Sequence, residues 1–219
     1  MVKLVFLCRR RPDLTHEHYV ERLLRGHVPI ALAHHPTLRR YVVNIVEESG
    51  GSAPALDSIG ELWFDSLADY RERLYDSAEG ARIVARDVAG FLGGADAYVT
   101  AEDPLASPPA PVPLGVRSPG AKLVVCATRA PGLARDEFRR RWLEDPLPPA
   151  LRAPDATRSV TGVVEERLGD EGPHYDGVAT LRFAAERPRI VAGPVSDVAG
   201  LRFLELVHAY RVDEYVERW

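Results

Sequence analysis

The chain lacks the features that mark several large functional classes. It has no excess of basic residues, because 28 Lys and Arg stand against 32 Asp and Glu, for a formal net charge of −4. The arginines are interspersed with acids, so no basic stripe for a nucleic-acid backbone is predicted. There is no G-x-G-x-x-G after a strand, no Walker loop and no G-x-S-x-G elbow, which argues against nucleotide cofactors and serine hydrolysis.

Cysteines and long apolar runs are also scarce. Cys8 and Cys126 lie in separate apolar runs without zinc-type spacing, which predicts small buried thiols. The first apolar run, MVKLVFLC, is too short to span a bilayer and no signal-peptide cleavage pattern follows it. We therefore expect a cytoplasmic protein that binds neither membranes nor nucleic acid.

What the chain does contain is an internal repeat at an offset of 119 residues. KLVFLCRRRPDL from Lys3 aligns with KLVVCATRAPGL from Lys122, and DSIGELWF aligns with DGVATLRF. The proline-rich stretch between the copies has neither helical nor strand periodicity, which is typical of a semi-rigid linker. A tandem duplication is predicted, with a first repeat at residues 1–103, a linker at residues 104–120 and a second, degenerate repeat at residues 121–219.

Each copy shows a β-α-β-β-α-β pattern that resembles a ferredoxin-like split βαβ unit. In the first copy Thr15 is the expected N-cap of a helix, which Gly26 and Pro29 should break or kink. Helices would cover one face of each sheet and leave the other face apolar. The predicted fold class is therefore α+β, with two tandem ferredoxin-like repeats packed sheet to sheet as an intramolecular dimeric α+β barrel. Such a pseudo-dimer within one chain leaves a further homodimer open.

Three segments of the first copy, RRRPDL, His27-Val28-Pro29 and LRRYVVN, together with IGELWF, resemble the EthD family of the dimeric α+β barrel group. The resemblance implies a pocket between sheet and helices within a repeat. It also implies functions among polyketide cyclases, decarboxylases and cofactor-free oxygenases. At the offset of 119 the second copy lacks the most telling residues, because His27, Tyr41, Asn44 and Trp63 align with Pro146, Val160, Val163 and Arg182. We therefore expect the site in the first copy.

His27 is the predicted catalytic residue. It follows Tyr19 and Leu23 at steps of four residues, which places all three on one helical face. An imidazole there can act as a general acid or base near neutral pH. A helix-end histidine bonded to loose carbonyls is the alternative. His34 is a candidate for the same face, whereas His35 before Pro36 is expected in a loop. No carboxylate completes a metal pair, so no metal is expected.

Three further residues are candidates for binding a substrate. Tyr41 and Asn44 point to opposite strand faces, so one of them at most lines a given side of the sheet. Either could hold a carbonyl or enol oxygen, although Tyr41 could simply pack in the core. Trp63 could stack on a flat ligand or only pack against its neighbours.

These residues predict a cofactor-independent tailoring enzyme of the cyclase or ring-closing type that acts on a polyketide-like or aromatic small molecule. The alternatives are a decarboxylase, a cofactor-free monooxygenase and a non-catalytic small-molecule carrier. A haem protein is a further alternative, because tandem barrels of this architecture can bind haem through a helix histidine.

Overall fold

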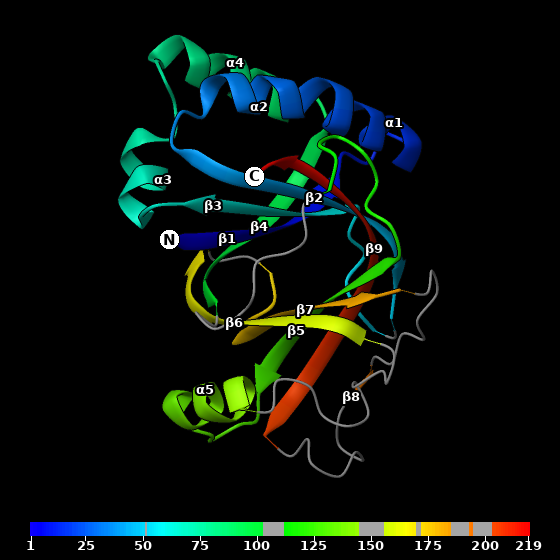
Figure 1. The fold of residues 1–219 in the computed structure, drawn as a ribbon, viewed down its shortest axis with the longest axis vertical. Helices are drawn as coiled ribbons and strands as arrows, with labels where there is room; N and C mark the ends of the chain where they lie inside the picture. The colour runs from blue at the N-terminus through cyan, green and yellow to red at the C-terminus, as the bar shows by residue number, and fades with distance from the viewer. Residues whose placement is uncertain (51, 103–111, 145–155, 170–171, 185–192, 195–202) are drawn as a thin grey trace.

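The computed structural model describes residues 1–50, 52–102, 112–144, 156–169, 172–184, 193–194 and 203–219 (Figure 1). The strands are β1 (Val2–Arg10), β2 (Leu38–Ser49), β3 (Ser58–Phe64), β4 (Leu92–Glu102), β5 (Ala121–Arg129), β6 (Ala156–Leu168), β7 (Gly177–Phe183), β8 (Gly193–Pro194) and β9 (Leu204–Arg218). The helices are α1 (His16–Glu21), the π-helical turn η1 (Arg22–His27), α2 (Val28–His34), α3 (Leu67–Arg73), α4 (Ala78–Ala89) and α5 (Arg135–Glu144). No helix in these ranges is long and apolar enough to cross a membrane.

The nine strands found in the described ranges all belong to one antiparallel sheet. Their order is β2-β3-β1-β4-β6-β7-β5-β9-β8, and an additional β2–β9 pairing closes the first eight into a barrel. The closing ladder runs from Tyr41 opposite Arg218 to Ser49 opposite Tyr210. Helices α1, α2 and α4 cover one side of the barrel, and α5 lies on the opposite side (Figure 1).

The predicted fold class is therefore wrong. The chain does not form two ferredoxin-like βαββαβ repeats packed sheet to sheet, but one closed eight-stranded antiparallel β-barrel with few helices. The finding that overturns the prediction is hydrogen bonding between the halves, along β4–β6 and β2–β9. An edge strand exposes unpaired amides and carbonyls, and closing the barrel pairs them. Between β7 and β9 the described residues contain only the two-residue strand β8, and no helix.

The ladders correct the residue correspondence expected between the halves. Lys3 pairs with Trp63 and Lys122 pairs with Arg182, as the offset of 119 requires. Tyr41, however, pairs with Leu62, whereas Leu181, the counterpart of Leu62, pairs with Ser159. The counterparts of Tyr41 and Asn44 are thus Ser159 and Gly162, one residue earlier than the expected Val160 and Val163. Pro146, the expected counterpart of His27, lies outside the described residues.

The two halves share one strand order, β2-β3-β1-β4 and β6-β7-β5-β9, but the duplication and its domain boundaries stay predictions. Of the predicted linker, residues 104–111 lie outside the described part of the chain. Within the remainder, the amides of Gly115 and Ser118 donate to the carbonyls of Val216 and Glu214 on β9.

The helical segment after β1 begins where the sequence predicts. The Thr15 side chain accepts a hydrogen bond from the amide of His18. Gly26 and Pro29 were expected to break or kink the helix, yet helical structure continues from α1 through η1 into α2. The intervening turn is π-helical, with the amide of Val28 bonded to the carbonyl of Leu23, five residues back. Proline has no amide hydrogen to donate, and its ring clashes with the carbonyl four residues earlier, so a wider turn before Pro29 relieves that clash. Single π-helical turns of this kind are frequent at functional sites.

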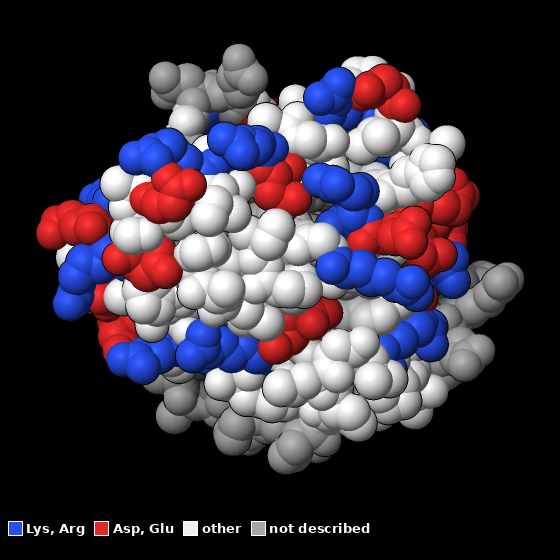
Figure 2. Space-filling model, turned by 90° about the horizontal axis from the view of Figure 1, so that it is seen from above, with Lys and Arg blue, Asp and Glu red and all other residues white. Residues whose placement is uncertain are grey.

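Charges on the helix-covered face are mixed. Figure 2 shows Lys and Arg interspersed with Asp and Glu around uncharged areas, with no field of one sign on that face. This arrangement agrees with the near-balanced composition, and it offers no basic track for a nucleic-acid backbone there.

Inside the barrel, a buried ion network joins the two halves. Lys3 Nζ lies 2.6 Å from Glu61, and Lys122 contacts both Glu61 and Glu214, the latter at 2.9 Å. Arg182 also donates to Glu214. Lys3, Lys122, Glu61 and Glu214 are each no more than 5% exposed. Removing one partner from such a pair would leave the other charge buried without compensation, which destabilises the fold.

This network predicts a loss of stability in acid. Burial alone would raise the pKa of Glu214, but Lys122 and Arg182 outweigh it and lower the pKa to about 2 from an ordinary 4.5. Since the folded state favours the carboxylate, its stabilisation is complete above about pH 4.5 and is lost as the pH falls toward 2. Urea unfolding at several pH values should show this decline, with a shallower slope in Glu214→Gln. Equal slopes in both proteins would contradict the assignment.

Candidate functional site

A cavity of about 230 Å³ lies between the helices and the sheet of the first half. Residues from strands β1, β2, β3 and β4, from α1, η1, α3 and α4, and from the loops after α2 and α3 surround it. Most of the lining is apolar or aromatic, and the polar members are Cys8, Tyr19, His27, His35, Tyr41, Ser58, Tyr70 and Tyr75. An empty apolar cavity of about 150 Å³ can hold benzene, so this cavity suits one substituted ring or two small fused rings.

His27 lines this cavity and is held by an acid. Its Nδ1 lies 3.0 Å from Asp87 Oδ2 on α4, and its side chain is 13% exposed. The second Asp87 oxygen, Oδ1, accepts from Arg22, at 3.1 Å. An imidazole that donates from Nδ1 to a carboxylate keeps its lone pair on Nε2. Burial lowers the pKa of His27, although the hydrogen bond to Asp87 acts in the opposite direction, so the neutral, basic form prevails at pH 7.

His35 is the cavity residue that the sequence interpretation missed. It follows the last residue of α2, in the loop where it is expected, but it is 6% exposed and lines the cavity with His27. Its Nδ1 lies 3.1 Å from the carbonyl of Leu74, which fixes Nδ1 as the donor. Burial lowers the pKa of His35, and the nearby His27 lowers it further. The signal in the sequence is Pro36, because a residue before proline disfavours helical geometry, and α2 indeed ends at His34.

Tyr41 also lines the cavity, on the outer face of β2. It is 5% exposed, and burial raises its pKa, so its hydroxyl remains protonated. Within the described residues that hydroxyl has no hydrogen-bond partner, which leaves it available to a ligand oxygen. Tyr19 is occupied instead, since its hydroxyl lies 2.7 Å from Ser58 Oγ. Cys8 is no nucleophile at neutral pH, because burial raises its pKa to about 12.

Three of the predicted site residues lie elsewhere. Asn44 faces the barrel interior, where its Nδ2 donates to Glu61 at 2.9 Å and to the carbonyl of Ile59 at 2.8 Å. Trp63 faces the same interior, with Lys3 Nζ 4.9 Å from its ring centroid. His34 lies outside the cavity, where its Nδ1 pairs with Asp76 at 3.0 Å.

The corresponding space in the second half is filled by aromatic rings. Phe138 and Trp142 occupy the positions that Tyr19 and Leu23 hold in the first half, and both are fully buried. Their rings stack with centroids 5.7 Å apart, and Trp142 Nε1 donates to the carbonyl of Gly162. A Cβ on Gly177 would lie 2.6 Å from the Trp142 ring. Among the described residues, these two rings therefore take up space that stays open as the cavity in the first half.

A haem group does not fit the cavity. Sites for drug-sized ligands occupy roughly 300–1,000 Å³, and a porphyrin is larger than the ligands that about 230 Å³ can hold. As for metals, the described residues contain no group of three or more His, Cys, Asp or Glu that could hold an ion.

Fold and cavity together define a closed antiparallel barrel with a small-molecule cavity beneath the helices of its first half. Residues 11–95 match the sequence profile of the EthD domain, which confirms the resemblance for this part of the chain. All the residues that line the cavity, except Phe6 and Cys8, lie within the matched range. A search among proteins of curated function finds no significant match.

Solved structures share the fold over nearly the whole chain. An anthrone oxidase-like protein superposes with a TM-score of 0.57 at 11% identity, over 99% of this chain and 92% of the other. A candidate chlorite dismutase superposes with a TM-score of 0.51 at 12% identity, over 96% and 94%. A candidate monooxygenase from Lactobacillus acidophilus has a TM-score of 0.47 at 8% identity, over 99% and 96%. At these identities the likeness concerns the fold alone.

Proposed function

We propose that this protein is a cofactor-independent enzyme that removes a proton from carbon beside a carbonyl group of a small aromatic or polyketide-like molecule. The observation that carries the proposal is His27, a partly buried imidazole that lines the cavity and is oriented by Asp87. A positioned neutral imidazole with a lowered pKa is suited to act as a general base. The cavity volume restricts the reacting part of the substrate to one or two rings.

In the proposed reaction His27 Nε2 takes the proton, and the electron pair of the broken C–H bond moves onto the carbonyl oxygen. The protonated hydroxyl of Tyr41 donates a hydrogen bond to that oxygen and stabilises the enolate. For ring closure, the enolate carbon then attacks a second carbonyl carbon, and the proton on His27 passes to the new alkoxide. This ring-closing reaction is the function we favour, because it begins and ends with the same base, His27, which Asp87 orients.

Reaction of the same enolate with dioxygen is the second candidate. One structural neighbour is described as anthrone oxidase-like, and anthrone is a flat ketone that loses a proton from carbon. Dioxygen uptake with a bicyclic ketone that has a similarly acidic C–H bond, faster than without enzyme, would favour oxidation over ring closure. Both candidates require the same first proton transfer.

That first step can be tested with a bicyclic ketone. The protein should speed the exchange of the acidic C1 protons of 2-tetralone in D₂O, as followed by proton NMR. Since a general base needs its free lone pair, the rate should rise with pH through an apparent pKa below the ordinary 6.5 of histidine and then level off. Binding of 2-tetralone without faster exchange would favour a carrier.

Asp87→Asn separates positioning from chemistry. The carboxylate stabilises the imidazolium, so its removal should move the apparent pKa further down. The plateau rate should fall as well, because the amide that replaces the carboxylate can leave His27 in the wrong tautomer. An unchanged pH profile would remove Asp87 from the mechanism.

A further inference from the structure

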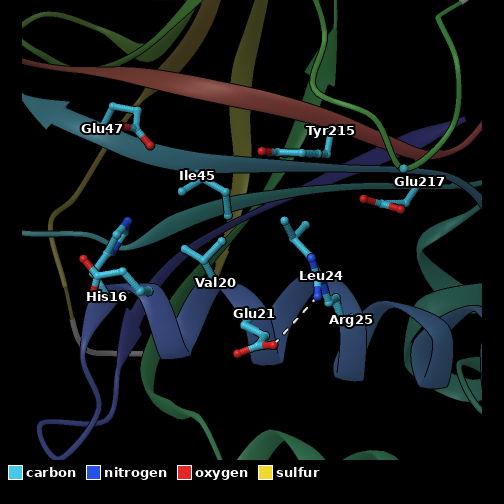
Figure 3. A pocket seen from close by; sticks show the side chains of 11 residues that line it. His16, Val20, Glu21, Leu24, Arg25, Ile45, Glu47, Tyr215 and Glu217 are labelled. Carbon is cyan, nitrogen blue, oxygen red and sulfur yellow. Dashed lines mark ion pairs between the residues drawn. The ribbon is translucent and has the colours of Figure 1, made fainter.

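A second, larger hollow lies outside the barrel, against a different face of the α1–η1 segment (Figure 3). We call it the outer groove, and its volume is about 590 Å³, within the roughly 300–1,000 Å³ of small-molecule sites. Val20 and Leu24 rise from the helix toward Ile45 on β2, while Tyr215 extends from β9 above them (Figure 3). The floor of the groove is therefore apolar, with one aromatic ring.

The lining of the outer groove is strongly acidic. Its carboxylates are Glu17, Glu21, Glu47 and Glu217. Arg25 is the single guanidinium among the lining residues, and it already lies 3.9 Å from Glu21. The other lining residue with a basic side chain, His16, is engaged by Asp57, at 3.0 Å. Negative charge is thus in excess, and it surrounds apolar surface.

Glu217 is the most unusual of these acids. It is partly buried, and the described residues supply neither an ion pair nor a hydrogen bond to its carboxylate. Burial raises its pKa for that reason. A carboxylate that has lost solvent without gaining a partner would be stabilised by a bound cation. Tyr215, two residues away on the same face of β9, could place its ring against the same cation.

We propose that the outer groove binds a small organic cation, namely a protonated amine that carries an apolar or aromatic body. The body would rest on Val20, Leu24 and Ile45, and the ammonium group would lie between Glu217 and Tyr215. This inference goes beyond the proposed function and does not depend on it, because the groove shares no lining residue with the His27 cavity.

Calorimetric titration of the full chain with 2-phenylethylammonium chloride tests the proposal. Saturable binding is expected, and the neutral isostere 2-phenylethanol should bind at least about tenfold more weakly. Glu217→Gln should weaken binding of the amine by about threefold to tenfold. The matched control Glu205→Gln removes the same charge from an exposed position of β9 outside the groove, and it should leave the affinity unchanged.

Two further variants locate the binding and keep the test independent of folding. Leu23→Trp introduces into the His27 cavity the same side chain that Trp142 provides at the equivalent position of the second half. It should not change the affinity for the amine, because Leu23 does not line the outer groove. Glu47→Gln alters an exposed acid and should also weaken binding, even if Glu217→Gln fails to fold. The proposal would be overturned if the alcohol bound as tightly as the amine, or if no saturable binding appeared. It would also fail if both Glu217→Gln and Glu47→Gln kept wild-type affinity, or if only a lysine-rich peptide bound.

Discussion

His27→Gln should lower the rate of proton exchange into 2-tetralone by about 10²–10⁴-fold, the usual contribution of a general base. Glutamine can still donate a hydrogen bond to Asp87, so the cavity should keep its shape, but it offers no basic nitrogen. The loss should appear in kcat with little change in KM, because the imidazole acts on the reacting proton rather than on the ligand as a whole.

His34→Gln is the matched control for this experiment. His34 lies in the same helical segment but outside the cavity, where it pairs with Asp76. Its replacement should leave exchange unchanged. If instead His27→Gln lost thermal stability while retaining exchange within about threefold, His27 would be only a helix-end histidine, and the proposed mechanism would fail.

Glu61→Gln should destabilise the fold by about 3–5 kcal/mol, the usual cost of removing one partner from a buried ion pair. Glu61 is 3% exposed and is shared by Lys3, Lys122 and the amide of Asn44. Burial alone would raise the pKa of Glu61, but Lys122 and Lys3 hold it well below its usual range. Glutamine keeps the shape and removes the charge that these neighbours require.

Thermal and urea unfolding measure this effect. For a chain of this size the loss corresponds to a decrease in Tm of roughly 6–20 °C. Glu205→Gln makes the same substitution at an exposed position and should stay within about 0.5 kcal/mol of the wild type. A change of that small size in Glu61→Gln as well would show that the interior network does not hold the two halves together.

Several local features could be predicted from the sequence because neighbouring residues determine them. Alternation along β2 correctly separated Tyr41, Val43 and Ile45, which face the helices, from Asn44, which faces the interior. Thr15 marked the start of α1, since a cap depends on residues within one turn. His27 and Tyr41 were identified from their motifs, and both line the cavity.

Other features depend on residues far apart in the chain. The sequence predicts Asn44 as a substrate ligand because a buried amide needs a partner, but its Nδ2 donates to Glu61 on the neighbouring strand. His35 lies just after the last residue of α2, and its side chain bonds to the carbonyl of Leu74, 39 residues later in the chain. Helical spacing from His27 pointed to His34 instead, because that spacing takes no account of where the helix ends. The one-residue shift in β6 moved the counterpart of Tyr41 to Ser159, because strand register is set by the partner strand.

Local periodicity, composition and motifs were sufficient to predict strands, the first helix, the balanced charge and the EthD resemblance. The closure of the strands into one barrel, the packing of Trp142 and Phe138 in the second half, and the bond from His27 to Asp87 on α4 became visible in the folded chain alone. Those outcomes arise from edge pairing, packing volume and hydrogen bonds between distant segments, and no short stretch of sequence contains both partners.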